Sequence, residues 1–292
     1  MQAAVRSHSG RAQVGSVVIY GVVAIFTFLC VVPFWYVLVS SFSQNGGFWI
    51  DEFTLDGYRY IFSTQTLPRS LINTTYITVL GTLLSVLVTS TMAYAVSKVY
   101  VPGMKLLNVL TVFTMFFAGG LIPTYMLYME MKLIRTYWVM VLPYGLSITY
   151  FIIMRNYFSY SVPRELEDAA RIDGCNDVRV FFQVILPLSK PMLAAVSLFI
   201  AVGFWNDYYS YMMYIATKPT LQPFAWVLRR VLTDSAMMSQ MRTGAVDIGA
   251  QLPPPMALRM ATIICAMVPI MCVYPFLQKY FTSGITLGAV KE

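Results

Sequence analysis

Six long stretches of the chain are almost free of charge, and they limit its possible folds more than any other feature of the sequence. A helix that crosses a membrane needs about 20 consecutive apolar residues, whereas strands in soluble cores are much shorter. Because backbone groups in lipid must pair within the protein, continuous apolarity of this length favours helices. The expected spans are residues 14–41, 71–97, 106–129, 137–154, 192–216 and 260–278.

The composition indicates the same class of protein. Apolar residues make up 58% of the 292 residues, and charged residues make up only 11%. A soluble protein carries about 25% charged residues, so this chain lacks the polar surface that a soluble enzyme or a disordered chain needs. A fibrous repeat is excluded too. We therefore expect an all-α, polytopic membrane protein with six transmembrane helices.

The basic residues and the cysteines predict no additional site. The net charge is +7, but the lysines and arginines are spread through loops, which indicates contact with membrane lipid rather than nucleic acid. The four cysteines form no CxxC pair, so we expect neither a disulfide framework nor a metal site. The first apolar run follows Arg6 and Arg11 but is far longer than a signal-peptide core, and we expect it to be an uncleaved span.

The charge of the loops predicts the topology. Six spans put both termini on one side, and a modest excess of basic residues in the short loops places that side in the cytoplasm. The predicted segments are a cytoplasmic tail (1–13), a first helix (14–41), an extracytoplasmic loop (42–70), a core with five helices (71–280) and a cytoplasmic tail (281–292). Within the core we expect a cytoplasmic loop (156–190) and an extracytoplasmic loop (217–259).

The first half of the cytoplasmic loop carries the signals of a short helix. Ser161 is a candidate N-cap, and Pro163 suits the first turn. Acidic residues then follow at the positive end of the helix dipole. Leu166, Ala169 and Ala170 lie at spacings i, i+3 and i+4, which places them on one face. Either this helix docks on another protein, or it is a surface helix whose charged face is solvated.

The second half of the loop predicts a second helix. Gly174 is expected to end the first helix, and Asn176 or Asp177 can cap the next one. Apolar residues at helical spacing follow over residues 180–185. Pro187 is expected to end this amphipathic helix.

The same loop resembles the cytoplasmic signature of the permease subunits of binding-protein-dependent ABC importers. That signature is E-A-A, three residues, G, nine residues and then I-x-L-P. The chain matches its spacing with Asp168-Ala169-Ala170, Gly174 and Val184-Ile185-Leu186-Pro187. Asp168 stands in place of Glu, and Val184 stands in place of Ile.

Other stretches, across about residues 14–292, are similar to the carbohydrate-uptake branch of this family. They are Asn73-Thr74, Gly119-Gly120-Leu121-Ile122-Pro123-Thr124, Phe204-Trp205-Asn206-Asp207 and Gly284-Ile285-Thr286-Leu287-Gly288-Ala289-Val290-Lys291. The context of residues 169–174 looks like permeases for acidic or complex oligosaccharides, such as alginate or aldouronate importers.

The resemblance implies a type I ABC importer permease fold in the bacterial cytoplasmic membrane. It implies a second homologous permease, two ATPase subunits that hold ATP and Mg²⁺, and an extracytoplasmic sugar-binding protein. This chain would then be a transport subunit for an oligosaccharide rather than an enzyme, and it would bind no cofactor itself. The short cytoplasmic helix would be the coupling helix that seats on an ATPase subunit. The implied coupling residues are Glu165, Glu167, Asp168, Ala169, Ala170, Arg171, Asp173, Gly174 and Pro187.

Polar and aromatic residues inside the predicted spans are candidates for the substrate path, because sugars suit aromatic faces flanked by hydrogen-bonding groups. These candidates are Asn73, Tyr76, Tyr94, Tyr144, Trp205, Asn206, Asp207 and Tyr208. Asp207, the one acid inside a predicted span, either contacts substrate or lies at a helix end and pairs with the backbone. Gly81 and Ser85 form a small-xxx-small step that suits helix packing.

Two other functions, a secondary transporter and a membrane-embedded enzyme, have less support in the sequence. An ion-coupled secondary transporter of a small solute would bury several ionisable groups along a relay, and this chain has one such candidate. A membrane-embedded enzyme is poorly supported, because the one histidine, His8, lies in the basic tail and no hydrolase or nucleotide-binding motif is found.

Overall fold

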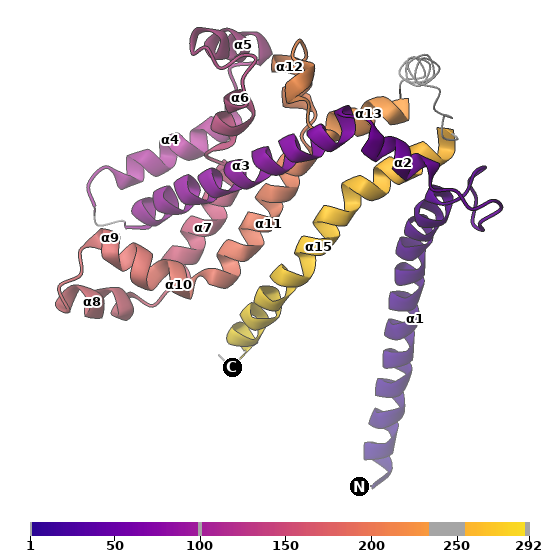
Figure 1. Ribbon diagram of the computed structural model, residues 1–292. Coiled ribbons are helices and arrows are strands. Elements are labelled where there is room, and N and C mark those ends of the chain that lie inside the picture. Colours follow the sequence, from indigo (N-terminus) through magenta and orange to yellow (C-terminus); the bar gives the residue numbers. More distant parts are fainter. Residues whose placement is uncertain (1, 99–100, 234–254, 290–292) are drawn as a thin grey trace. The chain divides into compact units, whose positions relative to one another are not determined.

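Helices are the regular secondary structure of the described chain, and the all-α prediction is confirmed (Figure 1). The computed structural model describes residues 2–98, 101–233 and 255–289. Side chains are described for residues 16–98, 101–233 and 256–275. The middle of the predicted 217–259 loop and the last three residues of the predicted tail lie outside these ranges.

The chain divides into two compact units, residues 1–63 with 234–265 and residues 64–233 with 266–292. The first unit holds α1 (Gln2–Ser41), α2 (Asp56–Ser63) and the start of α15 (Pro255–Ala289). The second unit holds the rest of α15 and α3 (Thr66–Ser97), α4 (Met104–Phe116), α5 (Leu121–Glu130), α6 (Trp138–Val141), η1 (Leu142–Tyr144), α7 (Ile148–Tyr160), α8 (Arg164–Ile172), α9 (Asp177–Arg179), η2 (Val180–Ile185), α10 (Leu186–Leu188), α11 (Lys190–Asn206), α12 (Tyr209–Tyr214), η3 (Pro219–Leu221) and α13 (Phe224–Thr233).

The described residues contain four helical segments that are long and apolar enough to cross a membrane. They are Ser16–Ser41, Thr66–Ser97, Trp138–Tyr160 and Met256–Pro275. Two bent pairs, α4 with α5 and the 177–188 segment with α11, raise the number to six if each pair is one span. Each of the six predicted spans therefore has a counterpart among these segments.

The third predicted span, 106–129, is bent rather than continuous. α4 and α5 meet at 118°, and the break between them contains Gly119 and Gly120. Gly120 has a φ of +85°, a conformation that other residues rarely adopt, so the glycine allows the sharp turn.

The fifth predicted span, 192–216, is shorter than expected. α11 ends at Asn206, because the backbone of Asp207 is extended (ψ 105°), and α12 forms a separate short helix. At its other end, α11 meets the preceding helical segment at 83°. The acid inside the predicted span therefore lies at a helix end.

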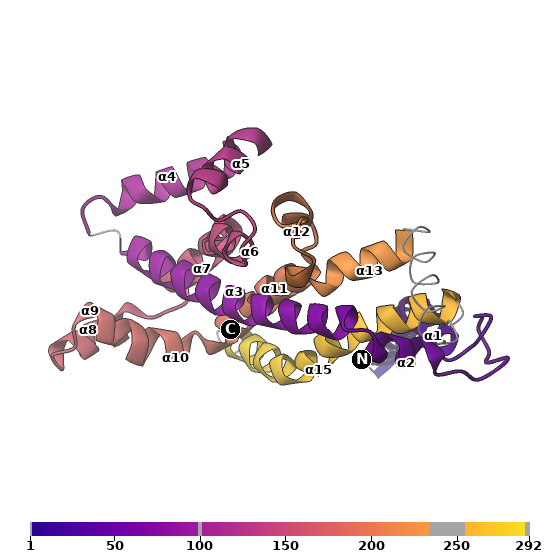
Figure 2. The ribbon, with the colours of Figure 1, turned by 45° about the horizontal axis from the view of Figure 1, so that its top comes forward.

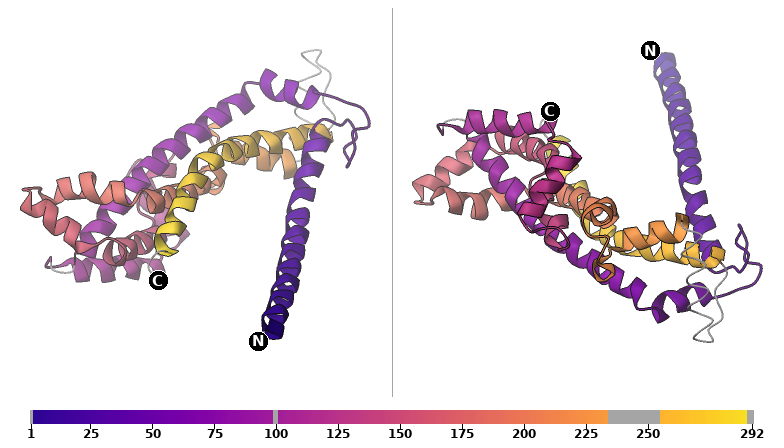
Figure 3. Two further views of the ribbon diagram at one scale, coloured as in Figure 1. Left: turned by 90° about the horizontal axis from the view of Figure 1, so that it is seen from below. Right: turned by 90° about the horizontal axis from the view of Figure 1, so that it is seen from above.

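The core of the second unit is built around α3, which packs along both α7 and α11 (Figures 2 and 3). Ile77 of α3, Phe151 of α7 and Ile200 of α11 are all buried in this core. α3 is tightly packed at Gly81, where an added Cβ would lie 2.6 Å from Cζ of Phe204 in α11. The predicted small-xxx-small step of Gly81 and Ser85 therefore lies on a packed face of α3.

Replacing Gly81 by alanine should lower the stability of the protein. The new methyl group would force the Phe204 ring to move, and overpacking of this kind costs about 1–3 kcal/mol. Gly203→Ala is the matched control, because a Cβ at that position of α11 meets nothing within 4 Å. The thermal unfolding midpoint in detergent should fall for Gly81→Ala and stay near wild type for Gly203→Ala, and equal midpoints would contradict the packing role of Gly81.

In the first unit, the chain after α1 folds back on itself. Ser43 pairs with Phe53, and the Thr54 N–H donates to the Phe42 carbonyl (2.9 Å). The Tyr58 hydroxyl donates to Ser41 Oγ (2.8 Å), and burial raises the pKa of this tyrosine against the lowering effect of the hydrogen bond. Trp49 remains 77% exposed, as an interfacial aromatic or a partner contact would require.

Candidate functional site

The predicted cytoplasmic loop, residues 156–190, contains α8, a tight turn and a second helical segment, as expected. α8 ends in a Schellman motif: the Cys175 N–H donates to the Ala170 carbonyl (2.9 Å), and the Gly174 N–H donates to the Arg171 carbonyl (3.0 Å). Gly174 has a φ of +83° and open space around the position of a Cβ. Its requirement for glycine therefore comes from the backbone conformation and not from crowding.

The start of α8 differs from the prediction. Pro163 takes the N-cap position in an extended conformation, whereas Ser161 ends α7 and donates its N–H to the Tyr157 carbonyl (2.8 Å). The serine was expected to cap α8, but α7 continues to Tyr160 and uses it instead. The expected acids, Glu165 and Glu167, do lie in the first turn of α8.

The second segment begins where expected. The Asn176 side chain accepts a hydrogen bond from the Arg179 N–H (2.9 Å), so Asn176 and not Asp177 is the cap. The helix continues through η2, a π-helical stretch, and ends at Leu188. Pro187 thus lies near the end of the 177–188 segment but does not end it. The proline is tolerated there because it falls in the first turn of α10.

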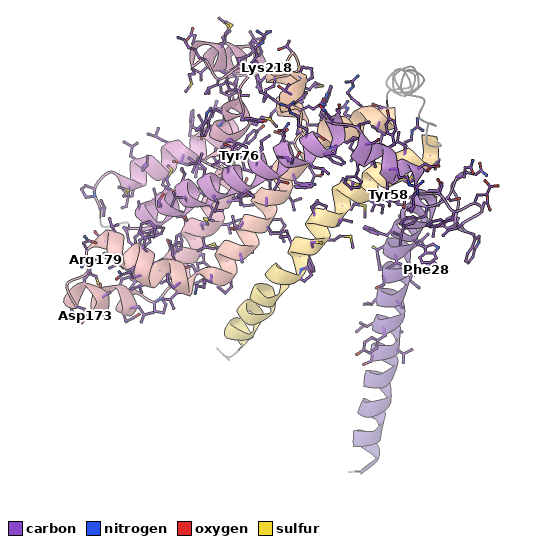
Figure 4. The ribbon with its side chains drawn as sticks, in the orientation of Figure 1. Phe28, Tyr58, Tyr76, Asp173, Arg179 and Lys218 are labelled. Atoms are coloured by element: carbon purple, nitrogen blue, oxygen red, sulfur yellow. The ribbon has the colours of Figure 1, made fainter. Side chains whose placement is uncertain are left out.

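α8 has a buried side and an exposed side. Glu167 (5% exposed) and Ala170 (9%) face the protein, whereas Leu166 (43%) and Ile172 (87%) are open. Ala169 shares the exposed side, so the two adjacent alanines face different ways. Figure 4 shows Asp173 and Arg179 at the tip of this segment, at the other end of the second unit from Lys218.

Charged contacts hold α8 in place. Glu167 forms an ion pair with Lys98, the residue that caps the C-terminus of α3, and both side chains are largely buried. Arg171 pairs with Asp168 (3.6 Å) and with Asp177 (3.0 Å), which links α8 to the start of the next helix. Glu167 is one of the coupling residues that the sequence implies, whereas Lys98 was not predicted.

A cavity of about 450 Å³ lies in the second unit beside α3, α7 and α11. Its lining consists mostly of aromatic and aliphatic residues, with a few hydroxyl, amide and carboxylate groups. The described residues that line it are Ser85, Tyr144, Leu146, Ser147, Tyr150, Phe199, Ile200, Gly203, Phe204, Asn206, Asp207, Tyr208 and Tyr209. No lysine or arginine is among these described residues.

Four of the candidate substrate residues line this cavity: Tyr144, Asn206, Asp207 and Tyr208. The Tyr144 hydroxyl lies 3.1 Å from Ser210 Oγ, and Asp207 Oδ1 accepts the Ser210 N–H (3.1 Å). Asp207 Oδ2 is buried and has no hydrogen-bond partner in the described part of the chain. Asn206 is exposed, and its side chain donates to the Val202 carbonyl (2.9 Å). Asp207 therefore lies at a helix end and pairs with the backbone, as one of the two alternatives predicted, and it also lines the cavity.

The other candidates lie elsewhere. Asn73 donates to the carbonyls of Thr220 and Gln222 (both 3.0 Å) and accepts from the Tyr137 hydroxyl (2.7 Å), so it ties α3 to the segment after α12. Tyr76 is half exposed and packs against Tyr137.

Trp205 and Tyr94 also lie outside this cavity. The Trp205 indole N–H donates to the Ala266 carbonyl (3.1 Å), and the ring lines a separate apolar cavity of about 200 Å³. Tyr94 packs against Phe158 and Phe181 in the core.

Sequence reasoning missed several cavity residues. Ser147, Tyr150 and Tyr209 line the cavity but gave no signal, since each is an ordinary residue of an apolar stretch. Ser85 was noticed only for helix packing. Its Oγ is buried without a hydrogen-bond partner in the described chain, and the residue lines the cavity.

Comparisons with known proteins give matches over most of the chain. The family model described as "binding-protein-dependent transport system inner membrane component" matches residues 92–287. The polygalacturonan/rhamnogalacturonan transport system permease protein YtcP of Bacillus subtilis is 39% identical, over 94% of this chain and 96% of that protein. Protein LplC of the same organism is 40% identical, over 90% of each. A chain of a bacterial ABC transporter involved in the import of the acidic polysaccharide alginate, known from a crystal structure, is 26% identical with a TM-score of 0.82, over 92% of this chain and 97% of that chain.

Proposed function

This chain belongs to the family of binding-protein-dependent transport system inner membrane components, and from that premise we propose that it is the permease subunit of an ATP-driven oligosaccharide importer. The observation that carries the proposal is α8. Its outer side presents Leu166, Ala169 and Ile172 to the surroundings, while its inner side is fixed to the membrane-spanning part of the unit through Glu167. A helix that exposes small and apolar side chains among acidic ones, and is anchored on its inner side, suits docking on a partner.

We propose that the outer side of α8 seats on an ATPase subunit. Small and apolar residues allow close approach, and the exposed acids Glu165, Asp168 and Asp173 can pair with a basic rim. ATP-driven closure of the ATPase subunits would then move α8 as a rigid body. ATP and Mg²⁺ belong on those subunits in this proposal, and this chain binds no cofactor.

The substrate is proposed to be an oligosaccharide that contains acidic sugars. YtcP is named for polygalacturonan and rhamnogalacturonan, and the structural neighbour takes part in alginate import. The cavity suits sugar rings, because Tyr144, Tyr150 and Tyr208 offer aromatic faces and hydroxyl groups. Since Asp207 is the one charged group of its described lining, we place the cations that would neutralise sugar carboxylates outside this cavity.

The proposed assembly contains this chain, a second homologous permease, two ATPase subunits and an extracytoplasmic sugar-binding protein. The family description supports the binding protein and the inner-membrane location. Both termini and α8 would lie on the cytoplasmic side, with membrane lipid around the apolar outer faces. In that topology the end of α3 at Lys98 also lies at the cytoplasmic side, where α8 meets it.

Purification of the tagged chain from mild detergent, followed by mass spectrometry and an ATPase assay, tests this proposal. We expect two ATPase subunits and a second permease to co-purify, with hydrolysis stimulated by the sugar-loaded binding protein. Uptake into vesicles should require ATP. A chain that purifies alone after co-expression with its neighbouring genes, and whose uptake follows an imposed ion gradient without ATP, would replace this proposal with the ion-coupled transporter.

A further inference from the structure

The ion pair between Glu167 and Lys98 joins α8 to the end of α3 across 69 positions of sequence. The Lys98 Nζ donates to both carboxylate oxygens of Glu167. The two side chains are 12% and 6% exposed, for Lys98 and Glu167 respectively, so water screens their attraction far less than that of a surface pair. The pair is a charged, buried connection between the cytoplasmic loop and a membrane-spanning helix.

The lysine is held on more than one side. Its Nζ lies 4.4 Å from the centre of the Tyr94 ring, a cation–π contact from within α3. The Tyr94 ring in turn packs edge-on against the ring of Phe158 in α7, with ring centres 6.0 Å apart. It also contacts the ring of Phe181 in η2, with ring centres 5.0 Å apart. A displacement of Glu167 therefore acts on a lysine that contacts Tyr94, whose ring packs against α7 and η2.

α3 extends from this pair to the cavity without a break. Ser85, which lines the cavity, lies 13 residues before Lys98, which is about 20 Å along a helix. Gly81, one turn further, contacts Phe204 of α11, and Phe204 lines the cavity as well. Movement of the Lys98 end of α3 consequently reaches two walls of the cavity.

We propose that the Lys98–Glu167 pair is a positioning strut that transmits movement of α8 through α3 to the cavity. This inference rests on the proposed function, since it assigns a route to the coupling between ATPase and sugar site. A buried ion pair adds little net stability compared with apolar packing, but it fixes one geometry. The pairs of Arg171 with Asp168 and Asp177 are more exposed and stay within the loop, so they hold its shape rather than join it to α3.

The test is the amount of sugar transported per ATP hydrolysed by the complete complex, reconstituted in liposomes with its binding protein. Glu167→Gln and Lys98→Met should each lower this ratio about fivefold or more, with ATP hydrolysis largely retained, because a coupling free energy between sites has this size. The charge-exchanged double variant Lys98→Glu with Glu167→Lys should recover most of the ratio. The proposed role depends on the attraction between the two opposite charges, not on which position carries which charge.

The control is Arg59→Gln, which breaks the exposed pair of Arg59 with Asp56 (3.6 Å) within α2, and its ratio should match wild type. An unchanged ratio in Glu167→Gln, or a parallel loss of transport and hydrolysis that the exchanged pair does not restore, would overturn the proposal. If the single variants fail to assemble, Glu167→Asp and Lys98→Arg keep both charges but alter the length of the strut, and an unchanged ratio in both again overturns it. Failure of the proposed function is distinct, because the wild-type complex would then show no ATP-driven uptake.

Discussion

Replacing Gly174 by valine should reduce sugar uptake by about 5- to 30-fold while the protein still inserts in the membrane. The residue has a φ of +83°, where a side chain costs about 1–2 kcal/mol, and a β-branched residue is especially unfavourable there. The Schellman turn would open, and the last turn of α8 would lose its position against the ATPase subunit. Uptake of labelled oligosaccharide into membrane vesicles, normalised to the amount of inserted protein, measures the effect.

The chain offers a matched control for this prediction. Gly103 has nearly the same φ (+87°) and equally open surroundings, but it precedes α4 and lies outside the α8 turn. Gly103→Val therefore imposes the same backbone strain and should leave uptake near wild type. Gly174→Asn should be intermediate, since asparagine tolerates this conformation better. Equal losses at Gly103 and Gly174 would show that general instability, not the position of α8, explains the defect.

Filling the cavity should block transport without harming assembly. Gly203 lines the cavity, and a Cβ there meets no atom within 4 Å, so Gly203→Phe places a ring in the space that we propose for sugar. Crowding of this kind costs about 1–3 kcal/mol, which weakens sugar binding about 5- to 150-fold. We expect uptake to fall by a comparable factor while the complex still purifies with its partners.

The control for this variant lies two residues away on the same helix. Ala201 lines the separate apolar cavity near Trp205, so Ala201→Phe adds the same ring outside the proposed sugar site. Its uptake should exceed that of Gly203→Phe clearly when both are compared at equal complex abundance. Normal uptake by Gly203→Phe would remove this cavity from the substrate path.

Much of the architecture was predictable because it depends on local signals. The apolar stretches set the helices, and the loop signature led to the family that the family match and the structural similarity confirm. The end of α8 at Gly174 and the cap at Asn176 were predictable too, because each depends on one residue and its immediate neighbours. Helix caps and turns can be predicted from the sequence when the interacting residues lie within a few positions of each other.

Contacts between distant segments were not predictable. Lys98 contacts Glu167 only when α3 and α8 come together, and neither local sequence predicts the ion pair. Asn73 looked like a substrate residue because it is polar within an apolar run, yet its amide satisfies backbone carbonyls near η3. The bend between α4 and α5 was missed for another reason: apolarity continues through Gly119 and Gly120, so hydropathy alone cannot separate one span from two half-length helices.

The length of α3 restricts how it can move. Its 32 residues extend about 48 Å, whereas the hydrocarbon layer is about 30 Å thick. A piston-like shift along the membrane normal would draw Arg69 at one end or Lys98 at the other towards the lipid, which is costly for a charged side chain. Tilting avoids this cost, because both ends stay in their aqueous layers. Gly81, halfway along the helix and against Phe204, would then act as the pivot of the tilt, so that a displacement of the Lys98 end would move the Arg69 end in the opposite direction.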